Sequence, residues 1–80
     1  MSEDEVFRVS GIEVRVTQEG EIWSRGHLLG RVARESRAGQ YFWRAFDPGA
    51  EEPVKRFLTA RHEAIQVLLL RADLIGGIGF

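Results

Sequence analysis

Hydrophobic and polar residues alternate along the first three quarters of the chain with the period of two that is typical of β-strands. The alternation is clearest where Ile12, Val14 and Val16 share one side of a segment and polar residues occupy the other. Short runs with Gly, Pro or Asp separate the alternating segments, as turns do. The pattern predicts two-residue connections at Ser10-Gly11 and Arg25-Gly26, a four-residue loop at Ser36–Gly39, and strands at Val6–Val9, Ile12–Val16, Glu21–Ser24, Leu28–Glu35, Gln40–Phe46 and Val54–Leu58.

The last quarter of the chain changes to a helical pattern. From Ala60 to Ile75 there is neither Pro nor Gly, and Gly76-Gly77 predicts the stop. We expect Thr59 to be the N-cap, because its hydroxyl can accept a hydrogen bond from a free backbone N–H of the first turn. His62 occupies the position at which Glu or Gln would complete a capping box with Thr59, so the box is expected to be incomplete.

Two apolar stripes run along this predicted helix. The broader one is the expected core face, formed by Ala64, Ile65, Leu68, Leu69, Ala72 and Ile75. A second strip, Val67, Leu70 and Leu74, is more than a helix on one side of a single sheet needs. Either the N-terminal strands or the tail 78–80 cover this strip, or it is an interface for a second copy or a protein partner.

Strands followed by a single helix predict an α+β fold, with an antiparallel sheet of four to six strands and one C-terminal helix packed on one face. Residues 1–5 are predicted to be a disordered acidic tail, and residues 6–80 a single domain. Residues 40–46 have aromatic groups on both sides, with Tyr41, Trp43 and Ala45 opposite Phe42, Arg44 and Phe46. Because Ala45 is small enough for a helix to approach closely, we expect its side to face the helix.

Composition excludes several classes of protein. The chain has no cysteine and two histidines, His27 and His62, which is too few for a convincing metal site, and no cofactor is expected. No Ser, Cys or paired carboxylate stands at a spacing that suggests catalysis, so we do not expect an enzyme. An acidic start and the lack of a long apolar run predict a cytoplasmic protein with no membrane span.

Charge is unevenly distributed, although the formal net charge is only −1. Residues 22–46 contain five arginines against one glutamate, Glu35. Arginine favours planar, bidentate contacts with phosphate and guanine, and neighbouring aromatic rings can stack on bases. The alternative is that these arginines have no binding role and only form a solvated face of the sheet or pair with glutamates across strands.

The segments Trp43-Arg-Ala45-Phe-Asp-Pro48 and Phe57-Leu-Thr59-Ala-Arg-His-Glu-Ala64 carry a resemblance to a known family. They resemble the three-stranded-sheet-plus-helix DNA-binding domain of the plant ethylene-response-factor (APETALA) type, which is similar to the arm-site binding modules of phage integrases. The resemblance covers Leu28 to Ala72. It implies that strands contact the major groove while the helix braces the sheet, with Arg31, Arg34, Trp43 and Arg44 as DNA-facing candidates and Phe57, Thr59 and Ala64 as structural residues.

These observations favour a small DNA-binding accessory or regulatory protein that contacts double-stranded DNA through an arginine-bearing sheet. The rival hypothesis, from another class, is a protein-interaction module or homodimer that uses the Val67, Leu70 and Leu74 strip. The two differ in their response to salt, since phosphate contacts weaken steeply as salt rises and apolar contacts do not.

Overall fold

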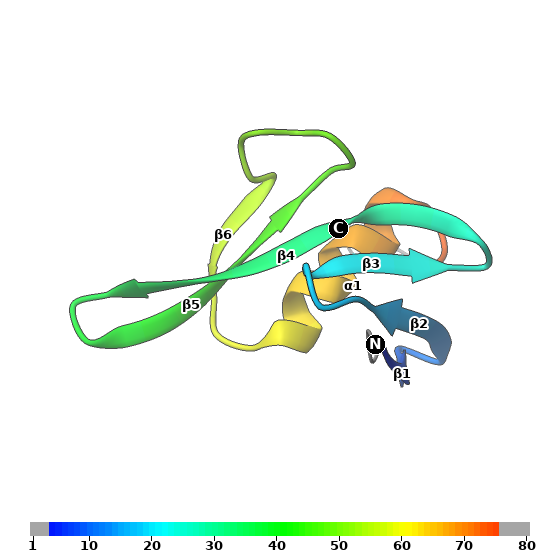
Figure 1. The fold of residues 1–80 in the computed structure, drawn as a ribbon, viewed down its shortest axis with the longest axis horizontal. Coiled ribbons are helices and arrows are strands. Elements are labelled where there is room, and N and C mark those ends of the chain that lie inside the picture. Colours follow the sequence, from blue (N-terminus) through cyan, green and yellow to red (C-terminus); the bar gives the residue numbers. More distant parts are fainter. Residues whose placement is uncertain (1–3, 76–80) are drawn as a thin grey trace.

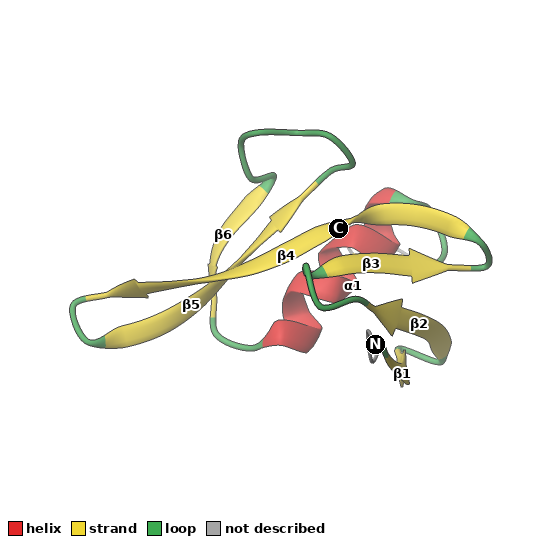
Figure 2. Cartoon of the chain, viewed as in Figure 1, coloured by secondary structure: helices red, strands yellow, loops and turns green. Residues whose placement is uncertain are grey.

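A computed structural model describes residues 4–75 of the chain. Within these residues, six strands precede one helix, and each strand pairs antiparallel with the next, in the order β1-β2-β3-β4-β5-β6. The helix lies across one face of this sheet (Figure 1, Figure 2), so the predicted α+β fold is confirmed. The elements are β1 (Glu5–Val9), β2 (Ile12–Val16), β3 (Glu21–Ser24), β4 (His27–Arg37), β5 (Gln40–Phe46), β6 (Lys55–Leu58) and α1 (Arg61–Arg71).

The predicted four-residue loop between β4 and β5 is wrong. Arg37 pairs with Gln40, so the connection is the two residues Ala38-Gly39, both with positive φ, 53° and 79°. Two positive φ values make a turn whose twist matches that of the strands it joins. The β4–β5 hairpin is therefore longer than expected, and its turn projects away from α1 (Figure 1). At the other end of the chain, β1 begins at Glu5, inside the predicted tail.

The helix starts one residue later than predicted, because Ala60 and not Thr59 is the N-cap. Glu63 therefore stands at the third helical position, where a capping glutamate belongs. Its Oε1 accepts hydrogen bonds from the backbone N–H of Ala60 (3.2 Å) and of Thr59 (3.1 Å) and from the Thr59 hydroxyl (2.8 Å). The bond from that hydroxyl, followed by the backbone bonds, holds the pKa of Glu63 below its ordinary value.

The core lies between α1 and the sheet face that we call the inner face. Ala64, Ile65, Leu68 and Leu69 of α1 are completely buried, as predicted. The sheet contributes Val14, Val16, Ile22, Leu29, Val32 and Ala45. Of the other two residues of the expected core stripe, Ala72 follows the last helical turn and is exposed, whereas Ile75 is half-buried and packs against the core. The expected stop at Gly76-Gly77 lies outside the described residues.

Close packing of α1 on the sheet depends on Ala45 and Gly30. Ala45 is fully buried, which confirms that its side of β5 faces the helix. Gly30 has φ +147°, and a Cβ at this position would collide with the carbonyl oxygen of Phe46 and lie 2.9 Å from Leu68 Cδ2. A larger residue would therefore force the helix and β5 away from β4.

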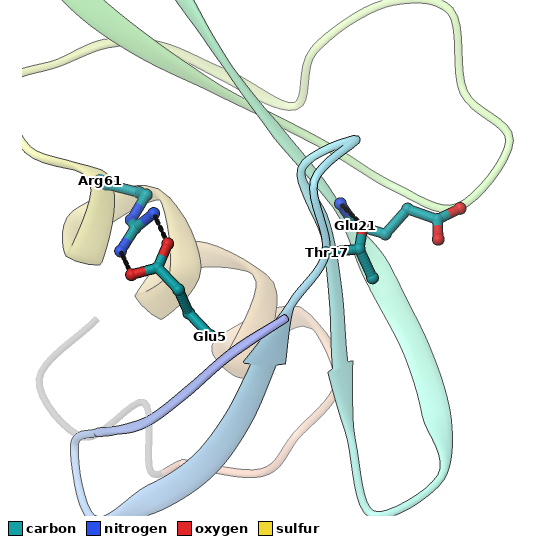
Figure 3. A network of polar contacts seen from close by, with 4 residues as sticks. All are labelled: Glu5, Thr17, Glu21 and Arg61. Carbon is teal, nitrogen blue, oxygen red and sulfur yellow. Dashed lines mark hydrogen bonds and ion pairs between the residues drawn. The ribbon is translucent and has the colours of Figure 1, made fainter. Parts of the chain in front are cut away.

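Polar contacts join the two ends of the helix to the sheet and its loops. The Glu5 carboxylate on β1 accepts two hydrogen bonds from the Arg61 guanidinium, at 2.9 and 3.2 Å, and these bonds lower the pKa of Glu5 (Figure 3). At the other end, Arg71 donates to both Asp47 oxygens, at 2.7 and 2.6 Å. Figure 3 also shows the β2–β3 turn, in which the Thr17 hydroxyl accepts from the backbone N–H of Glu21 at 3.1 Å.

A candidate nucleic-acid interface on the outer face of the sheet

The four predicted DNA-facing residues do not form one surface. Arg34 pairs with Trp43 across β4 and β5, and Trp43 packs against the core, so both belong to the inner face. Arg31 and Arg44 lie on the opposite face, which we call the outer face, with their guanidinium carbons 3.8 and 5.4 Å from the centre of the Phe46 ring. Because successive strand residues alternate between faces, Arg31 and Arg34, three positions apart, must separate. The structure therefore divides the four candidates between the two faces of the sheet.

The outer face of β4, β5 and β6 gathers arginines and phenylalanines. We call it the β4–β6 outer patch and define it by Arg31, Glu35, Arg37, Phe42, Arg44, Phe46, Arg56 and Phe57. Arg37 and Arg56 were not among the predicted site residues. Within this patch, four arginines stand against one glutamate, which leaves a net charge of +3 on a chain whose formal net charge is −1.

An irregularity in β6 brings two of these residues onto the same face. The register of β5 with β6 passes from Trp43 opposite Leu58 to Ala45 opposite Lys55, so both Arg56 and Phe57 lie opposite Arg44. Two residues opposite one constitute a β-bulge. Phe57 has φ +62°, which is uncommon for a residue with a large side chain. A regular alternation would have sent Arg56 and Phe57 to opposite faces, which is why the sequence pattern did not group them.

Phe57 is an exposed aromatic ring held by its neighbours. It is 48 % exposed, and its ring meets Phe42 edge to face with the centroids 5.7 Å apart. The guanidinium carbons of Arg37 and Arg56 lie 5.3 and 5.2 Å from its centroid. The resemblance assigned a structural role to Phe57, yet half of this ring is open to solvent and flanked by two cations.

Phe46 occupies the other end of the patch and differs from Phe57 in burial. It is only 2 % exposed, although it lies on the outer face as predicted. The guanidinium groups of Arg31 and Arg44 lie against its ring. These two arginines therefore shield the Phe46 side chain from water and also contribute positive charge to the patch.

Glu35 lies in the middle of the patch and pairs with two of its arginines. Arg56 Nη2 donates to Glu35 Oε2 at 3.3 Å, and Arg44 Nε lies 3.8 Å from Glu35 Oε1. The second distance is too long for a hydrogen bond, and both of its atoms are buried without a hydrogen-bond partner. Arg44 is thus close enough to Glu35 for electrostatic attraction, but the two side chains do not form a hydrogen bond.

The other predicted interface, the strip on α1, is not an open apolar surface. Val67 and Leu74 are half-buried and pack against the core, and Leu70 is also half-buried. The N-terminal strands approach this helix, as one of the two explanations expected: Gln66 Nε2 donates to the Ser10 hydroxyl of the β1–β2 turn at 3.1 Å.

Both histidines are exposed, and among residues 4–75 no group of three or more His, Cys, Asp or Glu side chains is arranged to hold a metal ion. No helix formed by the described residues is long and apolar enough to cross a membrane. No protein-family model, curated protein or solved structure matches the chain.

Proposed function

We propose that this chain is a small, non-enzymatic, cytoplasmic DNA-binding protein, accessory or regulatory in role, that contacts nucleic acid through the β4–β6 outer patch. One observation carries the proposal: the patch has a net charge of +3, and it contains a half-exposed ring, Phe57, between two arginines. Guanidinium groups neutralise phosphates, and an exposed ring offers a surface on which a base can stack.

The location of the patch also supports binding. It lies on the sheet face that α1 does not cover, and its arginines come from three adjacent strands. Adjacent strands are about 4.8 Å apart, so arginines on β4, β5 and β6 extend across roughly 10 Å. Several phosphates of one strand can therefore be contacted at the same time. As the resemblance implies, the proposed site is an arginine-bearing sheet braced by a helix. Among the candidate binding residues, however, Arg37 and Arg56 replace Arg34 and Trp43.

The test is a fluorescence-anisotropy titration of a labelled mixed-sequence DNA, both as a duplex and as one of its strands, at low and near-physiological salt. Arg37→Ala and Arg56→Ala should each weaken binding and flatten its dependence on salt. Arg34→Ala is the matched control, because it removes the same charge from an exposed position on the inner face of the same strand. Absence of binding to either DNA at low salt would refute the proposal.

The competing hypothesis of a homodimer or protein-interaction module rests on the Val67, Leu70 and Leu74 strip. Light scattering after size-exclusion chromatography separates it from DNA binding. A dimer that persists at high salt and dissociates on Leu70→Asp would favour the strip, because apolar association does not depend on counterions.

A further inference from the structure

The outer face holds a second feature, at the other end of the sheet. A shallow depression of about 460 Å³ lies on β1, β2 and β3. We call it the β1–β3 depression; Val6, Arg8, Ile12, Arg15, Trp23 and Arg25 are among the residues that line it. Its lining combines an indole with three guanidinium groups and one carboxylate, Glu13, so that arginines outnumber acids around an aromatic ring, as they do in the β4–β6 outer patch.

Trp23 is the aromatic wall of this depression. It is half-buried, its Nε1 donates to Glu21 Oε1 at 3.4 Å, and the Arg15 guanidinium carbon lies 5.6 Å from its ring. Val6, which is 57 % exposed, gives the depression an apolar side. Asp4 pairs with Arg15 at 3.3 Å, so part of the positive charge here is compensated.

The register relates this depression to the β4–β6 outer patch. Trp23 on β3 pairs with Arg15 on β2. Glu21, which lies on the same face of β3 as Trp23, pairs with Arg31 of the patch on β4. Trp23 on β3 and Phe57 on β6 are separated by three strand spacings, or roughly 15 Å across the sheet. The outer face of the described sheet thus has Trp23 on one side and Phe57 on the other, with two arginines, Arg31 and Arg44, and two carboxylates, Glu21 and Glu35, between them.

We propose that a single strand of nucleic acid crosses the outer face, with one base against Trp23 in the β1–β3 depression and another on Phe57. The inference rests on the proposed function and names the form of nucleic acid that is preferred. Ring faces that stack on bases require bases outside a helix, because a duplex hides the π-faces of its bases within its own stack. Arginines between the two rings fit the backbone that joins the stacked bases.

Oligomer length provides the first arm of the test. The two adjacent bases of a dinucleotide are too close together to reach both rings, whereas an oligonucleotide of twelve residues can span them. We expect labelled dT12 to bind more tightly than dT2 and than a mixed-sequence duplex at the same salt concentration. Running U12 in parallel shows whether the outer face also accepts RNA: tight binding of dT12 supports the proposal, whereas binding of U12 with no binding of dT12 or of the duplex would overturn both the proposed DNA-binding function and this inference.

Substitutions at the rings provide the second arm. Trp23→Leu and Phe57→Leu keep apolar side chains but remove the π-face, and each should weaken dT12 or U12 binding by about 5- to 150-fold, the range for loss of one base stack. Tyr41→Leu is the matched control. Tyr41 is 61 % exposed but belongs to the inner face, where its side chain lies beside Arg34, so this change should leave binding unaltered.

A fluorescence measurement tests contact at Trp23 without relying on a substitution there. In a Trp43→Phe variant, Trp23 is the remaining tryptophan of the chain, and unlabelled dT12 or U12 should quench its emission. Unchanged emission at saturation would overturn a base contact in the depression.

Duplex binding equal to or tighter than single-strand binding would overturn the preference for a single strand and leave the proposed function standing. Failure of dT12, U12 and the duplex to bind would overturn both the preference and the proposed function.

Discussion

Replacing Glu35 by Gln should strengthen nucleic-acid binding and weaken the fold at the same time. Glu35 is the negative charge of the β4–β6 outer patch, and its side chain is 17 % exposed between Arg44 and Arg56. The substitution removes one charge and keeps the size of the side chain, but it leaves one acceptor oxygen where the carboxylate has two. The net charge of the patch rises from +3 to +4, and both arginines lose an ionic competitor for phosphate.

The two expected effects can be estimated separately. A phosphate about 7 Å from the carboxylate is repelled by about 0.6 kcal/mol in water, so removing that charge should tighten binding roughly threefold. If one freed guanidinium engages a further phosphate, the slope of log K against log salt for duplex DNA steepens by about 0.9. For the fold, two partly exposed ion pairs are worth about 0.2 to 1 kcal/mol each. Because the Gln amide can still accept from Arg56, we expect a loss of about 0.5 to 1 kcal/mol, which corresponds to a decrease in Tm of about 2 to 8 °C.

The assay pairs anisotropy titrations across a salt series with thermal melts followed by circular dichroism. Glu19→Gln serves as the control, since Glu19 is exposed and lines a depression on the inner face. Affinity that is unchanged or weaker in Glu35→Gln, in a protein that still melts cooperatively, would refute the view that Glu35 opposes ligand binding on this face.

Three further predictions concern the fold. Leu68→Ala empties a completely buried position and should lower the free energy of unfolding by about 2 to 5 kcal/mol, a large part of the roughly 4 to 12 kcal/mol expected for 80 residues, as a urea titration would show. Gly30→Ala should lower Tm strongly because its Cβ collides with the Phe46 carbonyl, and an unchanged Tm would contradict the close approach of β4 to β5 at this position. Glu63→Gln should lower Tm at pH 7. Because the folded-state pKa of Glu63 is lowered, the stability from its ionised form is present above its ordinary pKa of 4.5 and is lost as the pH falls through the lower folded value, so the wild-type and variant melts should converge in acid.

Much of the fold follows from local patterns in the sequence. Alternation placed Val14 and Val16 in the core, and the small side chain of Ala45 indicated which side of β5 meets the helix. The exact start of α1 could not be fixed in this way, because Thr59 and Ala60 are adjacent candidates and the contact that decides between them is the reach of Glu63 back to the backbone.

The site was less accessible to sequence reasoning, for two different reasons. The separation of Arg31 from Arg34 follows from strand alternation alone, but the resemblance grouped them with Trp43 and Arg44 by motif instead of by face. The grouping of Arg56 with Phe57, in contrast, depends on a bulge. A positive φ at a phenylalanine has no local signal in the sequence, so it was not predictable from the pattern.

The arginines of the outer face have two physical roles, and the difference decides which substitutions are informative. A chain with six strands and one helix in its described part covers one sheet face with the helix and leaves the other to its own side chains. On that face Arg31 and Arg44 lie against a ring that is 2 % exposed, so truncating them exposes Phe46 and lowers stability whether or not a ligand binds. Arg37 and Arg56 flank a ring that remains 48 % exposed, and the fold gains little burial from them. If Arg37 and Arg56 bind a ligand, their removal should weaken binding while the fold loses at most the weak Arg56–Glu35 ion pair, and that combination distinguishes an interface from a solvated face.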